Sequence, residues 1–510
     1  MRMPGEGCGE SQRRSTSDQN ATSATLPFTR VGWRELKTSA ISAWALFVAT
    51  ACTGTLLEEK PSLVSPEPVQ SRSMSCLAMS GGGIRSGAVS LGALQELYAA
   101  NQQLSQYEFI STVSGGGYPV YGILDRILRG GRTLSDLLPE TSDFIADVDK
   151  QSKFITKTDI YTGAVLGAVL WAPLSWLPND YGGAVPTYEA EIHQTFTGGH
   201  WIPLFGTVML EKAKDIRSKG FPTPIFAASV NKGAHAPHAH QPPYGFNDVF
   251  ELSPTYSGSQ KTGYFYSVSK KTDLAAAEAA SASAIDTPTG YIRIPDGLKD
   301  LNFGLGVRFH APRSDAEYKD FNLEDGGFAD NLGLVPLLRR GCTDILVFDN
   351  SADQRPFESW YAFVDKLAGA GWRIPVPLHA APGVELPPSI PKTTTDDKVP
   401  PEVLHFWRWD LPDHIWDARL EVNGHDVHVR LVKLGLMSRK KWGAYSEPVG
   451  DFLNKNYAEK TLQCSGGGLH QTCSFPLEAT ARQSYETSEF QAYRHLGQWL
   501  AQQALSRAPQ

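Results

Sequence analysis

The chain contains 510 residues, of which 41 % are apolar and 20 % are charged, and its formal net charge is −7. This length and composition allow a full hydrophobic core and up to roughly two or three domains. The negative net charge argues against nucleic acid as the main partner, because such binding depends on a positive field along one face. Six cysteines are too few for a disulfide-built scaffold in a chain of this length.

The N-terminal part is predicted to precede the folded domain. Residues 1–37 are polar and rich in Ser, Thr, Gly and Arg, which predicts a disordered tail. Residues 38–52 carry no charge, follow several basic residues and end in small residues before Cys52, so they resemble an export signal with the lipidation site of a bacterial lipoprotein. A single membrane-anchoring helix and a buried helix are the alternatives for this segment. Residues 53–73 include a proline-rich stretch and are predicted to form a linker.

Residues 74–510 are predicted to form one folded domain of the α/β class. Apolar strand-like runs occur at Cys76 to Met79, Phe109 to Val113, Pro224 to Val230 and Ile345 to Phe348. A helix is predicted between the first two runs, at about Gly87 to Ala100. This alternation of strands and helices predicts βαβ units, and therefore a three-layer sandwich with a mainly parallel central sheet.

The first glycine cluster, SGGGIR, spans Ser80 to Arg85 and follows the first predicted strand. Glycines between a strand and a helix allow a tight turn that aims backbone N–H groups outward, which creates a pocket for an anion. A dinucleotide-binding loop would need glycine where Ser86 stands, and a phosphate-binding loop would need lysine where Ala88 follows Gly87. The remaining interpretation is an oxyanion hole for acyl transfer.

The second glycine cluster follows the second predicted strand, in FISTVSGGGYPV. Ser114 stands between the apolar strand and three glycines, which is where a nucleophile elbow presents its serine. Thr112 occupies the first glycine position of the usual elbow pattern, and Gly116 fills the second. Ser465 also precedes three glycines, but no apolar strand comes before it.

A serine nucleophile needs a base, and Asp325 is the candidate. It stands at the end of a short apolar stretch, directly before Gly326 and Gly327, in FNLEDGGFADNLGLVPLL. Glycines there let the backbone approach another loop, so the carboxylate could meet Ser114 although the two residues are far apart in sequence. Taken alone, an Asp before two glycines is more often a turn residue. Glu324 and Asp330 are interpreted as turn and solvent residues rather than as a second base.

These three pieces, in this order, resemble the patatin-like phospholipases and the related cytosolic phospholipase A type enzymes. The resemblance covers most of the chain from Leu77 onward. Further similar segments are ASASAI (Ala280 to Ile285), DNLGLVPLLRRGCTDILVFD (Asp330 to Asp349) and FPLEATARQSYETSEFQAYRHLG (Phe475 to Gly497).

The resemblance implies a patatin-like fold and a catalytic dyad of Ser114 and Asp325, without a histidine base. It also implies an oxyanion hole formed by the backbone of Gly81, Gly82 and Gly83. Arg85 is implied as a cation that supports the hole or holds a lipid phosphate, whereas a purely structural role at the turn is the alternative. No cofactor is implied, and activity without calcium is expected because no calcium-binding module is recognised.

The implied function is a lipid acyl hydrolase of the phospholipase A or lysophospholipase type, which cleaves esters of membrane lipids through an acyl-enzyme. Its partners would be a membrane phospholipid or lysophospholipid and the membrane surface. An esterase or thioesterase on soluble acyl esters is the alternative enzyme, and a non-catalytic lipid-binding lipoprotein is the alternative of another class. The predicted location is at a membrane as an exported lipoprotein, with cytoplasmic and single-helix-anchored forms as alternatives.

The histidines and cysteines of the chain are candidates for metal ligands and for disulfides, respectively. Three histidines lie in the proline-containing segment 232–243 without a carboxylate, so an exposed loop is favoured over a metal site and no metal is assigned. Cys464 and Cys473 flank a short glycine-rich loop that a disulfide could close in an oxidising compartment. Cys76 and Cys342 lie in apolar runs and are interpreted as small core residues.

Overall fold

The computed structural model describes residues 63–64, 73–100, 103–151, 208–230, 245–267, 272, 274–282, 307–310, 320–353, 357–380, 405–406, 408–465, 472–480, 482 and 485–507. All of them belong to the compact unit Pro61–Gln510. The predictions for residues 1–37, for residues 38–52, for most of the linker and for the histidine segment lie outside the described part of the chain. Within that part, no helix is long and apolar enough to span a membrane.

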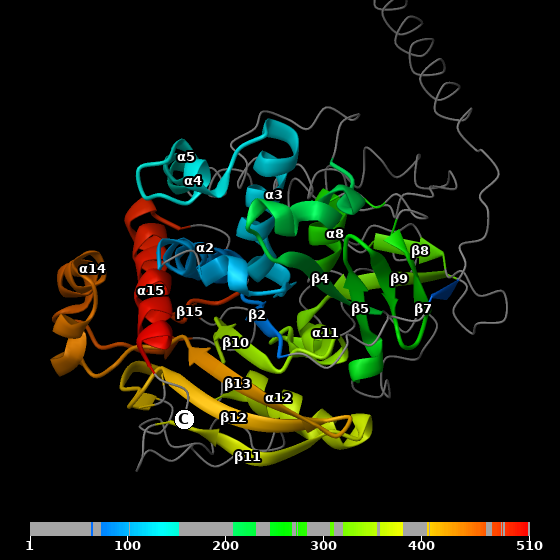
Figure 1. Cartoon of the computed structure of the whole chain (residues 1–510). Coiled ribbons are helices and arrows are strands. Elements are labelled where there is room, and N and C mark those ends of the chain that lie inside the picture. Colours follow the sequence, from blue (N-terminus) through cyan, green and yellow to red (C-terminus); the bar gives the residue numbers. More distant parts are fainter. Residues whose placement is uncertain are drawn as a thin grey trace, which may run out of the picture. The chain divides into compact units, whose positions relative to one another are not determined.

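A thirteen-stranded mixed sheet organises the described residues (Figure 1). Its centre has the strand order β4–β3–β2–β10–β13, and each neighbouring pair there is parallel. These strands are β2 (Ser75–Met79), β3 (Phe109–Val113), β4 (Thr223–Val230), β10 (Asp344–Asp349) and β13 (His425–Lys433). The predicted α/β fold with a mainly parallel central sheet is confirmed.

Antiparallel strands extend this parallel centre on both sides. Beyond β4 follow β5 (Val249–Leu252), β6 (Tyr256–Ser259), β7 (Gly263–Tyr266) and β1 (Leu63–Val64). Beyond β13 follow β12 (Ile415–Val422) and β11 (Arg373–His379). Strand β9 (Asp320–Asp325) pairs with β4 and with β8 (Val307–His310), and a separate pair is formed by β14 (Cys464–Ser465) and β15 (Thr472–Cys473).

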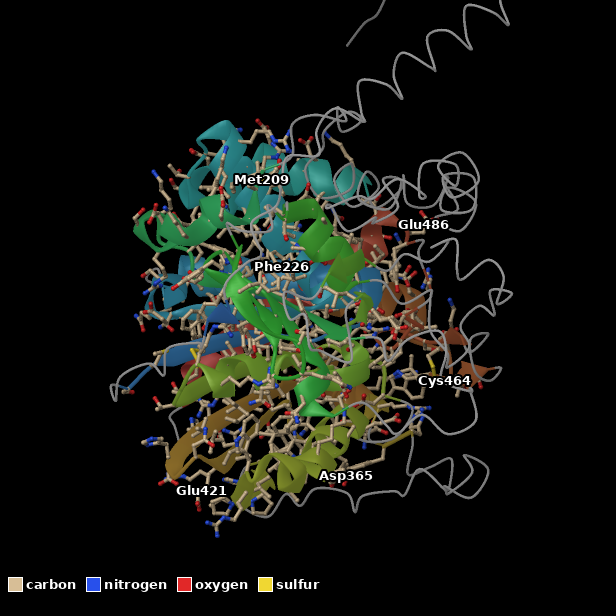
Figure 2. All side chains as sticks on the ribbon, turned by 90° about the vertical axis from the view of Figure 1, so that its right-hand side faces the viewer. Met209, Phe226, Asp365, Glu421, Cys464 and Glu486 are labelled. Atoms are coloured by element: carbon tan, nitrogen blue, oxygen red, sulfur yellow. A yellow bond between two sulfur atoms is a disulfide. The ribbon has the colours of Figure 1, made fainter. Side chains whose placement is uncertain are left out.

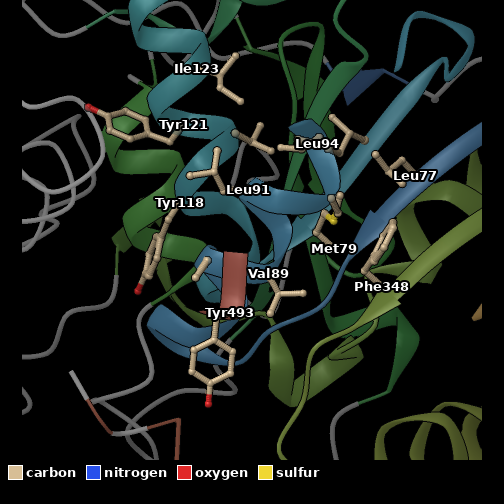
Figure 3. Close-up of a cluster of buried hydrophobic side chains, with 14 of the residues drawn as sticks. Leu77, Met79, Val89, Leu91, Leu94, Tyr118, Tyr121, Ile123, Phe348 and Tyr493 are labelled. Atoms are coloured by element: carbon tan, nitrogen blue, oxygen red, sulfur yellow. The ribbon is translucent and has the colours of Figure 1, made fainter. Parts of the chain in front are cut away.

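Residues of the central strands point alternately into two hydrophobic cores, one on each face of the sheet. In β2, Leu77 and Met79 belong to the larger core, whereas Cys76 and Ala78 belong to the other. The larger core, part of which is seen in Figure 3, is closed by α2 (Gly83–Ala99), α3 (Tyr118–Gly130), α8 (Leu274–Ser281), α14 (Glu447–Tyr457) and α15 (Thr487–Ser506). The other core is closed by α11 (Leu334–Arg339) and α12 (Glu358–Leu367). Phe226 of β4, labelled in Figure 2, is fully buried in the larger core.

Shorter elements connect these layers. The short α-helices are α4 (Leu134–Leu137), α5 (Asp143–Gln151) and α10 (Gly327–Asp330). The 3-10 helices are η2 (Gln103–Gln106), η3 (Ser114–Gly117), η5 (Leu210–Lys219), η6 (Phe246–Asp248), η8 (Ala368–Ala370) and η10 (Arg439–Ala444).

Helices α2 and α15 are in close contact because each contributes a glycine. A Cβ at Gly92 would overlap the carbonyl oxygen of Arg494, and a Cβ at Gly497 would overlap that of Val89. A side chain at either position would therefore force the two helices apart. This packing fixes the direction of α2, and with it the place of the glycine loop that precedes the helix.

Two disulfides are present in the described residues. Cys464 and Cys473 are bonded, as the sequence suggested for an oxidising compartment. Cys76 and Cys342 are fully buried, as predicted for core residues, but they are also bonded to each other across a sequence separation of 266. The second disulfide was not predicted. It ties β2 to the segment that leads into β10, its neighbour in the sheet.

Candidate active site

Ser114 follows β3 directly and has a backbone conformation that is uncommon for a residue with a side chain. Its φ is +51°, in the left-handed region, and strain of this kind costs about 1–3 kcal/mol and is concentrated at functional sites. Thr112, which stands where the usual elbow pattern has glycine, is buried and its hydroxyl donates to the carbonyl oxygen of Ile225 over 3.4 Å. The sharp turn from β3 through η3 into α3 therefore forms with threonine in this position.

The turn depends on the glycines that follow Ser114. A Cβ at Gly115 would overlap the carbonyl oxygen of Gly83, and a Cβ at Gly116 would lie 2.6 Å from the carbonyl oxygen of Ser80. Both carbonyls belong to the first glycine cluster. Only glycine at these positions lets the two loops approach this closely.

Strand β4 brings Ser114 and Asp325 together, because β3 and β9 reach the same edge of β4 from opposite ends. The last residue of β3, Val113, is aligned with Ala227, and the last residue of β9, Asp325, is aligned with the next residue, Ala228. The parallel strand β3 and the antiparallel strand β9 thus end facing each other. Two segments far apart in sequence meet at this point.

Asp325 is hydrogen-bonded to the hydroxyl of Ser114. Its Oδ1 also accepts the backbone N–H of Gly327 at 2.8 Å. Burial raises the pKa of Asp325 from 3.8 to about 6, and the two hydrogen bonds oppose this rise only in part. A carboxylate with a raised pKa accepts a proton from a hydroxyl more readily than an exposed one does.

The glycine loop lies against Ser114, but its three amide groups differ in whether they already have a hydrogen-bond acceptor. A Cβ at Gly81 would lie 3.4 Å from the Cβ of Ser114, yet the N–H of Gly81 donates to the carbonyl oxygen of Asn331 at 3.0 Å. Gly81 is therefore not available as an oxyanion donor, which corrects the expectation for this residue. Within the described residues, the amides of Gly82 and Gly83 at the start of α2 have no acceptor.

Arg85 binds backbone carbonyl groups of two distant segments. The guanidinium is fully buried, and it donates to the carbonyl oxygen of Asn350 from Nε at 3.2 Å and from Nη2 at 3.1 Å. A further donor, Nη1, binds the carbonyl oxygen of Glu478. The role at a lipid phosphate is therefore not supported. Arg85 instead holds the glycine loop against two distant segments, which is the structural alternative.

Ser281, the last residue of α8, connects the turn at Ser114 to the turn that follows Asp325. Its hydroxyl accepts the backbone N–H of Ser114 at 3.0 Å and donates to the carbonyl oxygen of Ala227 at 2.7 Å. Its own carbonyl oxygen accepts the N–H of Gly326 at 3.1 Å. The sequence had marked this segment only through its resemblance, and these contacts give Ser281 a positioning role.

Asn331 connects the glycine loop to the turn that follows Asp325. Its Oδ1 is so close to both loops that a Cβ at Gly81 would overlap it and a Cβ at Gly327 would lie 2.9 Å away. Its Nδ2 donates to the hydroxyl of Ser359 at 3.0 Å, which in turn donates to Asp353 at 3.0 Å. This chain of hydrogen bonds fixes the amide between the two glycine turns.

The other carboxylates near Asp325 are buried, whereas the sequence had suggested that they are exposed to solvent. Glu324 is fully buried in β9. Asp330 is also buried and accepts the backbone N–H groups of Leu332 at 3.2 Å and Val335 at 2.7 Å. The turn role predicted for Asp330 is correct, but its exposure to solvent was wrong.

Solved structures with the same arrangement of elements exist. The fold is similar to that of human GIVD cytosolic phospholipase A2. The chain matches this protein with a TM-score of 0.53 and 13 % identity, over 85 % of its own length and 60 % of the length of that structure. A second structure of the human enzyme, in complex with methyl gamma-linolenyl fluorophosphonate inhibitor and terbium chloride, matches with a TM-score of 0.50 and 14 % identity. No protein-family model and no curated protein sequence matches the chain.

Proposed function

We propose that this chain is a patatin-like lipid acyl hydrolase that uses Ser114 as nucleophile and Asp325 as its base. The observation that carries the proposal is the hydrogen bond between a serine in a strained turn and a buried carboxyl group, where two strands meet on β4. The amides of Gly82 and Gly83, which have no acceptor among the described residues, would add the third group that acyl transfer needs, a pair of donors for the oxyanion.

In the acylation step, Oγ of Ser114 attacks the ester carbonyl carbon while its proton passes to Asp325. The carbonyl oxygen becomes an oxyanion and receives hydrogen bonds from Gly82 and Gly83. The bond to the alcohol then breaks, and the leaving oxygen takes the proton from Asp325. The fatty acyl group remains bonded to Ser114.

In the deacylation step, water attacks the acyl carbon and gives one proton to Asp325. When the second oxyanion collapses, the bond to Ser114 breaks and the serine oxygen recovers that proton, so the free enzyme returns and a fatty acid leaves. A base with a pKa of about 6 remains ionised at neutral pH and is still basic enough to take part in both steps.

A lipid substrate is supported by observations outside the dyad. The human enzyme with the similar fold was solved with a linolenyl fluorophosphonate, a lipid-like inhibitor. The uncharged segment 38–52 and the two disulfides both support export, since disulfides persist in oxidising compartments. We therefore propose a phospholipid or lysophospholipid as substrate, at a membrane to which the chain is attached as a lipoprotein.

The test is covalent labelling by a fluorophosphonate probe combined with fatty-acid release from phospholipid vesicles. The wild type should be labelled and active, whereas Ser114→Ala should lose labelling and at least about a thousandfold in activity. Ser465→Ala is the matched control, because Ser465 also precedes glycines but lies in β14, and it should behave as wild type.

Each other outcome points to a different conclusion. Turnover retained by Ser114→Ala would contradict the mechanism. Hydrolysis of short soluble esters without release from vesicles would favour the soluble-ester alternative. A wild type that is neither labelled nor active would favour the non-catalytic lipid-binding protein.

A further inference from the structure

Glu278 is a fully buried carboxyl group beside the nucleophile turn, and the proposed mechanism does not yet use it. It lies in α8, one helical turn before Ser281, and every other residue of that helix, LAAAEAAS, is uncharged. Neither carboxyl oxygen has a hydrogen-bond partner within the described part of the chain. A buried unpaired polar group destabilises a fold, so its presence at this position calls for a functional explanation.

The carboxyl group is directed at the turn that carries the nucleophile. A Cβ at Gly117, the last residue of that turn, would overlap Oε2 of Glu278 and lie 2.8 Å from its carboxyl carbon. Helix α8 also packs on β4 and on β9, which ends in Asp325. The side chain that packs against Gly117 is thus a carboxylic acid rather than an apolar group.

Within the described residues, Asp325 is the one charged group that changes the pKa of Glu278. Strand β4 and the turn η3 contain no ionisable side chain. The ionisable residues on the remaining neighbours are Tyr118, Tyr121, Asp125, Arg126 and Arg129 on α3, Arg308 and His310 on β8, and Asp320 and Glu324 on β9.

Glu278 is therefore harder to ionise than an exposed glutamate. Burial raises its pKa well above the usual range, and the negative charge of Asp325 raises it further. Ionisation of Glu278 would add a second negative charge, in addition to that of Asp325, against the turn that carries Ser114. Such a charge opposes formation of the oxyanion.

We propose that Glu278, packed against the turn that carries Ser114, is a positioning residue that acts through its charge: as a neutral acid it permits hydrolysis at Ser114, and its ionisation switches hydrolysis off. This inference deepens the proposed function and rests on it. It predicts an alkaline limb in the pH profile, whereas Asp325 accounts for the acid limb.

The experiment compares wild type, Glu278→Gln and Glu278→Met, with a soluble acyl ester as substrate and with the rate of fluorophosphonate labelling as a second readout. Above the pH at which Glu278 ionises, the wild-type rates should fall by about tenfold for each pH unit. Both variants, which cannot ionise at this position, should keep a level rate over the same range. Glu96→Gln is the matched control, because burial also raises the pKa of Glu96 but this residue lies on α2, and its profile should keep the wild-type limb.

A third readout does not require activity. Infrared difference spectra at neutral pH should contain the carbonyl band of a protonated carboxylic acid in the wild type, and this band should be lost in Glu278→Gln. An alkaline limb that persists in both variants, or an unchanged infrared band, would overturn the inference and leave the hydrolase proposal intact. A wild type that the probe does not label would instead overturn the proposed function, and with it the regulatory role of Glu278.

Discussion

Replacement of Asp325 by Asn is expected to abolish hydrolysis and, at the same time, to stabilise the fold at neutral pH. Burial raises the pKa of Asp325 from 3.8 to about 6. Ionisation of a carboxyl group whose pKa is higher in the folded chain than in the unfolded chain lowers the free energy of unfolding, here by about 3 kcal/mol. Asparagine has nearly the same shape, can still accept the N–H of Gly327, and carries no charge, so the variant should regain most of this free energy.

The sign of the effect defines a pH window. Below 3.8 the carboxyl group is protonated in both states, so Asp325→Asn and wild type should be equally stable. From there to about pH 6 the wild type should lose stability relative to the variant, and above about pH 6 the difference should be constant. Hydrolysis by the wild type should rise through the same pH range, as the base becomes ionised.

Thermal unfolding of both proteins between about pH 4 and pH 8, at constant ionic strength, measures this difference. Asp136→Asn is a control of opposite sign, because hydrogen bonds from Thr133 lower the pKa of that exposed carboxylate. An Asp325→Asn protein that is less stable than wild type at pH 8, or a difference that does not vary with pH, would refute the reasoning.

Two further substitutions test the positioning of the nucleophile. Ser281→Ala removes the acceptor of the Ser114 N–H and should lower kcat by about ten- to a hundredfold with little change in KM. Ser281→Thr should restore part of the rate. A wild-type kcat in the alanine variant would contradict the positioning role of Ser281. Gly115→Ala places a methyl group on the carbonyl oxygen of Gly83 and should destabilise the fold by about 1–3 kcal/mol and prevent fluorophosphonate labelling. Thermal unfolding and labelling check this, and wild-type behaviour in both assays would contradict the close approach of the two loops.

Local signals in the sequence were sufficient for the strand and the turn that carry Ser114. The run Phe109–Val113 was predicted with its observed bounds, because an apolar strand that ends in serine and glycines is readable from neighbouring residues alone. The helix after the glycine loop begins at Gly83, four positions before the predicted Gly87. The difference arises because Gly82 and Gly83 have φ of 151° and 65°, so the chain turns within the glycines and the helix starts at once.

Long-range partners could not be predicted in the same way. The pairing of Cys76 with Cys342 and the binding of Arg85 to the carbonyl oxygens of Asn350 and Glu478 depend on which distant strands become neighbours. No periodicity in the sequence encodes that choice. The antiparallel strands on both sides of the sheet escaped prediction for the same reason, since short β-runs do not reveal their partners.

The meeting of β3 and β9 on one edge of β4 means that the proposed dyad is a product of the finished fold. A polypeptide that has been synthesised only as far as the first two strands carries the serine in its turn but has no proton acceptor for it. In the proposed mechanism, hydrolysis can begin only after the later segment has been added in register. Incomplete chains and proteolytic fragments that lack β9 would also lack the proposed base, so we expect them to be inactive.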